Sequence, residues 1–367
     1  MIKIDLRRLW LWLTAHIDSL LLSFMLMLML IGLIVLYSAT GQDLGKTTSQ
    51  MVNMLVALAA MWAVANVSPQ HIARAALPVY GLGLLLLLGV ALFGDISHGA
   101  RRWLNIGIRI QPSEMMKLAV PLMLAWYLDR REKTLNLKDF GFAVLMLAAP
   151  VGLIVKQPDL GTALLISASG FYVLFLAGLS WRIILGLAAM GALSAPVLWS
   201  LLHDYQRQRI LTLIDPSQDP LGTGYHIIQS SIALGSGGVF GKGWFNGTQA
   251  HLDFLPERTT DFIFAVYAEE FGLAGNLVLL ALYVLVIGRG LVIAAKAPTL
   301  FSRLLAGSIT LTFFTYAFVN MGMVSGILPV VGVPLPLISY GGTSMVTLLV
   351  GFGMLMSIQT HRKLVQS

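Results

Sequence analysis

The run IDSLLLSFMLMLMLIGLIVLY, residues 17–37, decides the fold class of this chain. Its one charged side chain, Asp18, stands at its start, and the rest is apolar or carries only a hydroxyl. A helix needs about 20 such residues to cross the hydrocarbon core of a bilayer. Nine further predominantly apolar runs predict about ten transmembrane helices in total, the others lying near residues 50–67, 77–93, 114–128, 139–156, 160–178, 182–201, 262–288, 303–325 and 343–360.

The composition supports the same fold class. Hydrophobic residues make up 57% of the 367 positions and charged residues only 11%, whereas about a quarter of a soluble domain is charged. Inside lipid the backbone must satisfy its own hydrogen bonds, and these runs are too long for barrel strands. We therefore expect an all-α, polytopic membrane protein with a single domain over residues 1–367. The chain has no cysteine, which excludes disulfides, thiolate nucleophiles and cysteine-bound metals.

The net charge of +7 and the pI near 9.7 have a topological explanation. Basic residues collect at the cytoplasmic ends of membrane helices, so no nucleic-acid partner is predicted. With the amino terminus inside, both termini are cytoplasmic, and the basic residues fall mostly on that side, near residues 3–8, 74, 130–138, 182, 289–303 and 362–363. The large loop 202–260, between helices 7 and 8, is then extracytoplasmic. Its aromatic residues favour a folded loop with an amphipathic helix at 225–234.

The segment FLPERTTDFIFAVYAEE, residues 254–270, brings a carboxylate, Asp261, to the start of the eighth helix. Ionised groups at membrane level are costly and are usually functional. An aspartate in the first helical turn also complements the helix dipole without any catalytic role, so position alone leaves both interpretations open. Its basic neighbours favour a general base beside an anionic leaving group, because cations stabilise developing negative charge; the charged neighbours are Glu257, Arg258, Arg207 and Arg209.

Further charged residues interrupt the apolar runs. Glu114 and Lys117 are three residues apart, so they share a helical face and can form an ion pair. A structural pair at the lipid boundary and a functional pair fit this spacing equally. Asp159 can join them in one polar cluster that orients or tunes a nearby site. We expect Glu269 and Glu270, deeper in the eighth helix, to be paired within the bundle.

One long segment makes the sequence specific. NMGMVSGILPVVGVPLPLISYGGTS, residues 320–344, resembles the signature of the SEDS family, the membrane proteins of shape, elongation, division and sporulation. The resemblance covers nearly the whole chain and is greater to the elongation branch than to the division branch. It extends through GARRWL (99–104), QPSE (111–114), QPDLG (157–161), HDYQRQR (203–209) and LPERTTDF (255–262).

The resemblance implies a ten-helix peptidoglycan glycosyltransferase that polymerises lipid II into β-1,4 strands during cell elongation. It implies a multi-pass protein of the bacterial cytoplasmic (inner) membrane, with its active site on the outer face. The implied partners are a class B penicillin-binding protein, which supplies transpeptidase activity, and other membrane proteins of the elongation complex.

The resemblance also assigns residues. The family's essential aspartate falls on Asp261, and its polar cavity falls on Glu114, Lys117 and Asp159. The diphosphate would be stabilised either by basic residues or by a divalent cation, Mg or Mn. The candidate basic residues, with Glu257 near them, are Arg102, Arg207, Arg209 and Arg258. Asp261 is either the general base or a ligand of that cation; no organic cofactor is expected.

A transporter or flippase of the same lipid is the alternative function. Ten spans, a polar cluster and interrupted helices also suit alternating access, although no inverted repeat is evident. An intramembrane protease lacks support, because the chain has neither His-Glu-x-x-His nor Gly-x-Ser-x-Gly.

Overall fold

The computed structural model describes residues 14–97, 100–105, 109–132, 135–201, 204–219, 222–251, 254–255 and 257–361. Both chain ends and the first residues of loop 202–260 lie outside these ranges. Every predicted apolar run coincides with a helix, which confirms the all-α fold class. These helices are α2 (Ser19–Ala39), α3 (Leu44–Ala65), α5 (Ala76–Phe93), α6 (Pro112–Asp129), α7 (Leu137–Lys156), α8 (Leu160–Leu176), α9 (Trp181–Leu201), α13 (Ile263–Ala295), α14 (Leu300–Val324) and α15 (Gly342–Thr360).

Seven of these helices are long and apolar enough to cross a membrane, counted over the described residues: α2, α3, α5, α7, α13, α14 and α15. The apolar part of α8 and of α9 is shorter, and α6 carries the charged residues Glu114 and Lys117 near its start. Prolines interrupt α6, α7 and α9 at Pro121, Pro150 and Pro196.

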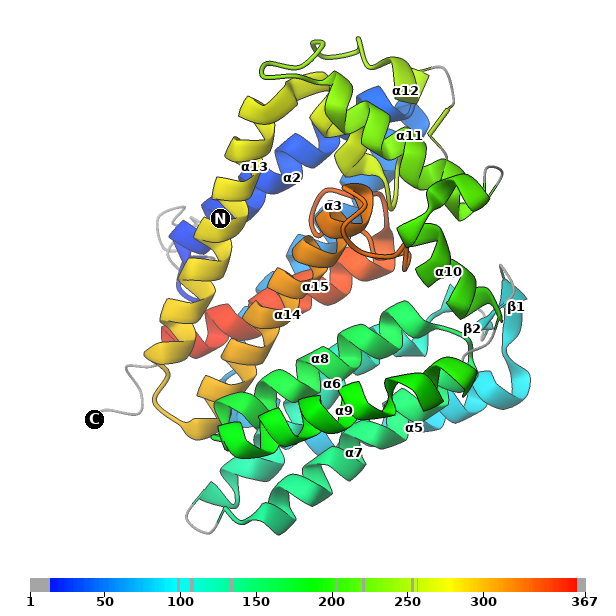
Figure 1. Ribbon diagram of the computed structural model, residues 1–367. Coiled ribbons are helices and arrows are strands. Elements are labelled where there is room, and N and C mark those ends of the chain that lie inside the picture. Colours follow the sequence, from blue (N-terminus) through cyan, green and yellow to red (C-terminus); the bar gives the residue numbers. More distant parts are fainter. Residues whose placement is uncertain are drawn as a thin grey trace, which may run out of the picture.

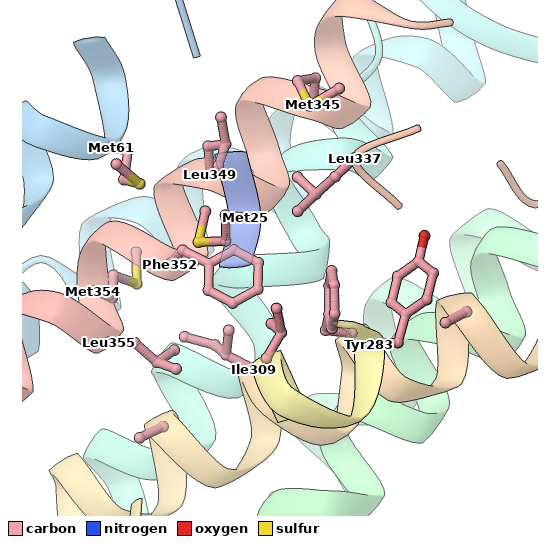
Figure 2. Close-up of a cluster of buried hydrophobic side chains, with 14 of the residues drawn as sticks. Met25, Met61, Tyr283, Ile309, Leu337, Met345, Leu349, Phe352, Met354 and Leu355 are labelled. Carbon is pink, nitrogen blue, oxygen red and sulfur yellow. The ribbon is translucent and has the colours of Figure 1, made fainter. Parts of the chain in front are cut away.

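Helix α14 lies at the centre of the bundle. It contacts α6, α8, α13 and α15, and Figure 1 shows it with α15 between the group α5–α9 and the pair α2 and α13. Figure 2 shows part of the core around it, with Phe352 of α15, Met25 of α2 and Tyr283 of α13 among the buried side chains. Phe352 and Tyr283 each pack a ring against Phe313 of α14. The centre of the bundle is therefore filled by side chains.

Two polar loops contain structure that the sequence analysis did not resolve. The strands β1 (Asp95–Ser97), β2 (Ala100–Asn105) and β3 (Arg109–Ile110) form a small antiparallel sheet, in which Leu104 pairs with Ile110. These strands are too short to show an alternating pattern. Loop 202–260 contains α10 (Asp204–Ile214), a 3-10 turn (Pro216–Gln218), α11 (Thr223–Ser236) and α12 (Thr248–His251), so the predicted amphipathic helix at 225–234 is confirmed as α11.

Helix α13 is broken at Gly272, where φ is 64° and ψ is −161°. The loop after α11 satisfies the backbone groups freed by the break: Leu273 N–H donates to Gly238 O and Ala274 N–H to Val239 O, both at 2.9 Å. In a membrane a broken helix requires such internal partners. The loop thus belongs to the structure of α13.

Glu269, a buried residue of α13, holds the same loop by hydrogen bonds. Its Oε1 accepts hydrogen bonds from Lys242 Nζ at 2.6 Å and from the Thr248 N–H at 2.9 Å, and the glutamate is fully buried. Glu270 accepts a hydrogen bond from the Ser38 hydroxyl of α2. Glu270 is thus bonded within the helix bundle, as predicted, whereas Glu269 is paired to the loop instead.

The break in α13 generates a stability prediction. Gly272→Ala places a β-carbon at a backbone conformation that only glycine adopts readily, 2.3 Å from the Gly241 nitrogen. We expect a loss of about 2 kcal/mol or more, measured as a lower unfolding temperature in detergent. The matched control is Gly288→Ala in the same helix, where the β-carbon meets nothing within 4 Å. The control should be neutral or stabilising, and equal unfolding temperatures for the two variants would contradict the prediction.

Candidate active site

A polar cavity of about 490 Å³ opens among α6, α8, the segment before α13 and the connection from α14 to α15. Four carboxylates and two basic side chains line it: Asp261, Glu257, Glu114, Asp159, Arg102 and Lys117. Most of the charged residues that the sequence singled out therefore share one cavity, although they come from segments far apart in the chain.

A tight turn presents Asp261 to this cavity. The N–H groups of Thr260 and Phe262 both donate to Glu257 O, at 3.1 and 3.2 Å. The N-cap residue of α13 is Phe262, and no side chain caps this helix. Asp261 therefore lies one residue before the N-cap, outside the first turn, and does not cap α13.

The surroundings of Asp261 favour its protonated form more than water does. Burial, with a smaller contribution from the charge of Glu257, raises the pKa of Asp261 to about 6. Glu257 itself is exposed at the cavity mouth, where its carboxylate accepts a hydrogen bond from the Thr260 hydroxyl at 2.9 Å. A carboxylate with this pKa is mostly ionised at neutral pH, and a general base works best when its pKa is near the working pH.

The predicted ion pair of α6 is present. Lys117 Nζ donates to Glu114 Oε1 at 2.5 Å and lies 5.1 Å from the ring centroid of Tyr316 on α14. The other carboxylate oxygen of Glu114 is buried and has no hydrogen-bond partner. Because a buried polar atom without a partner is costly, this oxygen is available to a group bound in the cavity.

A second ion pair joins the small sheet to α8. Arg102 of β2 lies with its Nε 3.4 Å from Asp159 Oδ2, and its Nη2 donates to Pro158 O at 3.3 Å. Asp159 also caps α8 by accepting a hydrogen bond from the Thr162 N–H at 3.3 Å. The hairpin in loop 94–111 thus brings Arg102 to the cavity.

The three other candidate arginines are not among the cavity-lining residues. Arg207 donates to the carbonyl oxygens of Trp199 and Ser200, at 3.0 and 2.7 Å. Arg258 Nε donates to Ala39 O at the end of α2, at 2.7 Å. Arg209 likewise lies outside the cavity wall. A position near Asp261 in sequence, or in the same loop, did not show whether a side chain lines the cavity.

Several lining residues were not singled out by the sequence analysis. Tyr340, Thr343 and Ser344 belong to the signature 320–344, so that segment already pointed to them, whereas Tyr316 precedes it and gave no signal. Gln111 and Thr260 complete the polar wall and belong to the motifs QPSE and LPERTTDF that the sequence analysis quoted.

Comparison with known proteins places the chain in a family. The family model of the cell cycle proteins FtsW, RodA and SpoVE matches residues 18–364. Peptidoglycan glycosyltransferase MrdB of Escherichia coli K12 is 52% identical over 355 residues, which cover 96% of each chain. A probable peptidoglycan glycosyltransferase FtsW of Geobacter metallireducens is 37% identical and covers 90% of this chain and 92% of its own.

Solved structures have the same fold. The rod shape determining protein RodA of Thermus thermophilus matches with a TM-score of 0.72 and 30% identity, over 94% of this chain and 97% of that one. A chain from a peptidoglycan synthase complex, solved to study the coordination of polymerisation and crosslinking, matches with a TM-score of 0.82 and 35% identity, over 94% and 98%. This chain therefore belongs to the FtsW, RodA and SpoVE family, the SEDS family of multi-pass membrane proteins that includes the peptidoglycan glycosyltransferases MrdB and FtsW.

Proposed function

We propose that the protein polymerises lipid II into β-1,4 glycan strands during cell elongation, with Asp261 as the general base. The observation that carries this proposal is the cavity in which a carboxylate of raised pKa faces the same space as Lys117 and Arg102. A base and cations around one space suit the deprotonation of a hydroxyl beside an anionic leaving group.

The reaction is a single displacement. Asp261 takes the proton of the acceptor GlcNAc 4-hydroxyl while that oxygen bonds to the anomeric carbon of the donor MurNAc. The bond from this carbon to the diphosphate oxygen breaks, and undecaprenyl diphosphate leaves with both electrons. One inversion converts the α-linked donor into a β-linked product.

The charge balance of the cavity favours a divalent cation as an additional component. Glu114 pairs with Lys117 and Asp159 with Arg102, whereas Asp261 and Glu257 form no ion pair among the described residues. Mg²⁺ is commonly bound by one or two carboxylates together with substrate phosphates. We therefore propose that Glu257, together with Asp261 where Asp261 is a cation ligand instead of the base, would hold Mg or Mn, which would neutralise charge on the diphosphate. No group of three or more acidic, histidine or cysteine ligands forms within the described ranges, so the substrate would supply the remaining ligands.

An apolar cavity of about 720 Å³ adjoins the site and suits an isoprenoid tail. It lies among α3, α5, α6 and α15 and shares Gln111, Glu114 and Thr343 with the polar cavity. Aliphatic side chains such as Val56, Leu118 and Val350 line it. A lipid-linked sugar bound with its tail here would have its diphosphate at the polar cavity.

The family resemblance and the charge pattern support the remaining parts of the proposal. The basic residues near 130–138 and 289–303 favour a cytoplasmic location for that end of the bundle, which supports the proposal that both termini lie inside and that the Asp261 cavity lies at the outer face of the cytoplasmic membrane. The similar chain from a peptidoglycan synthase complex supports a class B penicillin-binding protein as the partner. Other elongation-complex membrane proteins are proposed on the resemblance alone.

Removal of the base tests the function directly. Asp261→Asn should lower glycan formation by about 10²-fold or more, measured with purified full-length protein, its penicillin-binding partner and labelled lipid II. Asp43→Asn is the matched control, because Asp43 caps α3 away from the cavity and asparagine caps equally well. Normal polymerisation by Asp261→Asn would refute the assignment, and lipid II crossing vesicles without glycan formation would favour the transporter.

The raised pKa of Asp261 generates a pH prediction. The base must be ionised, so kcat should fall as the pH drops through about 6, by about tenfold per unit well below this value. Glu257→Gln removes a negative charge that raises the pKa of Asp261, so the fall in kcat, taken relative to this variant's own maximum, should occur at a lower pH. If the kcat of the wild-type protein fell only at about pH 4, the ordinary pKa of an aspartate, the prediction would be contradicted.

The two interpretations of the Glu114–Lys117 pair can be separated. Lys117→Met leaves Glu114 without its cation and should destabilise the protein by about 3 kcal/mol or more. Adding Glu114→Gln removes the stranded charge and should restore most of the unfolding temperature. We expect glycan formation by the double variant to stay about tenfold lower, because a cation near the diphosphate is gone. Recovery of activity together with stability would show a purely structural pair.

A further inference from the structure

The backbone of the Asp261 turn is bound to the connection between α14 and α15. Three consecutive carbonyl oxygens of the turn each accept one hydrogen bond from that region. The bonds run from the Tyr340 N–H to Thr259 O at 2.9 Å, from the Ser339 hydroxyl to Thr260 O at 2.5 Å and from Asn320 Nδ2 to Asp261 O at 2.8 Å. The turn has few conformations in which all three hydrogen bonds can form.

Asn320 and Ser339 each make a second bond that fixes the connection, residues 325–341. Asn320 Nδ2 also donates to Val333 O at 2.7 Å, and its side chain is fully buried. Ser339 Oγ also accepts from the Leu335 N–H at 2.8 Å. Each side chain therefore joins the connection to the Asp261 turn, and neither points at the cavity as a reacting group.

A third element supports the same arrangement. Gln50 of α3 is fully buried, and its amide donates to Ser339 O and accepts from the Gly341 N–H, both at 3.2 Å. The connection also packs against the carboxylate itself, since a β-carbon on Gly332 would lie 3.4 Å from Asp261 Oδ2. The segment that forms one cavity wall, Gly332 to Pro334, thus also fixes the position of Asp261.

We propose that Asn320 and Ser339 are positioning residues, which hold the Asp261 carboxylate at the correct distance from the acceptor hydroxyl. The inference rests on the proposed function of Asp261 as the base. Proton transfer requires heavy atoms about 2.6–3.2 Å apart, and a misplacement of about 1 Å costs about 10²-fold in rate. Residues that fix the turn therefore act on kcat, whereas the binding of the lipid tail and sugars depends on other walls of the cavity.

Four variants of the full-length protein, assayed with its partner and a range of lipid II concentrations, test the proposal. Ser339→Ala and Asn320→Ala remove the donors, and Ser339→Thr keeps the hydroxyl as the conservative variant. Ser325→Ala is the matched control, because the Ser325 hydroxyl donates only to carbonyl oxygens at the end of its own helix, Met321 O and Gly322 O. Unfolding temperature is measured for each.

We expect Ser339→Ala and Asn320→Ala to lower kcat by about tenfold or more with KM changed by less than about twofold. Ser339→Thr should recover most of the rate, and Ser325→Ala should match wild type. If Asn320→Ala does not fold, Ser339→Ala and Ser339→Thr decide the matter. Wild-type kcat in Ser339→Ala, or an equal loss in Ser339→Thr, overturns the positioning role.

The outcome for Asp261→Asn, run alongside, separates the two hypotheses. A wild-type protein that makes glycan, an inactive Asp261→Asn and an unchanged Ser339→Ala would overturn the positioning role alone. A fully active Asp261→Asn would overturn the proposed base, and the positioning role would fall with it.

Discussion

The structure depends on one constraint: a polar group removed from water must find a partner within the protein. Helices satisfy the backbone of the long apolar runs, and at two places where the described chain departs from a helix another segment supplies hydrogen bonds. The break at Gly272 in α13 is covered by the loop 237–243. The turn before α13 is covered by residues 320–340. In both places hydrogen bonds to another segment hold the non-helical backbone in position.

The same constraint shapes the cavity. Two of its carboxylates are neutralised by Lys117 and Arg102, which leaves Asp261 and Glu257 as the anionic pair. Burial and this like charge together explain why the pKa of Asp261 is raised, despite basic residues nearby in sequence.

The sequence predicted much of the fold because a membrane helix is a local property. Each apolar run carries its own length and composition, so the ten helices and the amphipathic α11 could be located without knowledge of their packing. The small sheet at 95–110 could not, because strands of a few residues carry no periodic signal. Arg258 was placed with Asp261 by sequence nearness, yet its side chain donates to Ala39 O and is not among the residues that line the cavity.

By itself, the sequence determined the class of fold and the family, because hydrophobic runs and motifs are written residue by residue, and it pointed to Asp261 as a candidate. Only the tertiary structure decided which charges meet. Arg102 reaches Asp159 through a hairpin, Lys117 reaches Tyr316 across α6 and α14, and Asn320 reaches the carbonyl oxygen of Asp261. These contacts join residues far apart in the chain, and their distances follow from how the helices pack around α14, which no local pattern records.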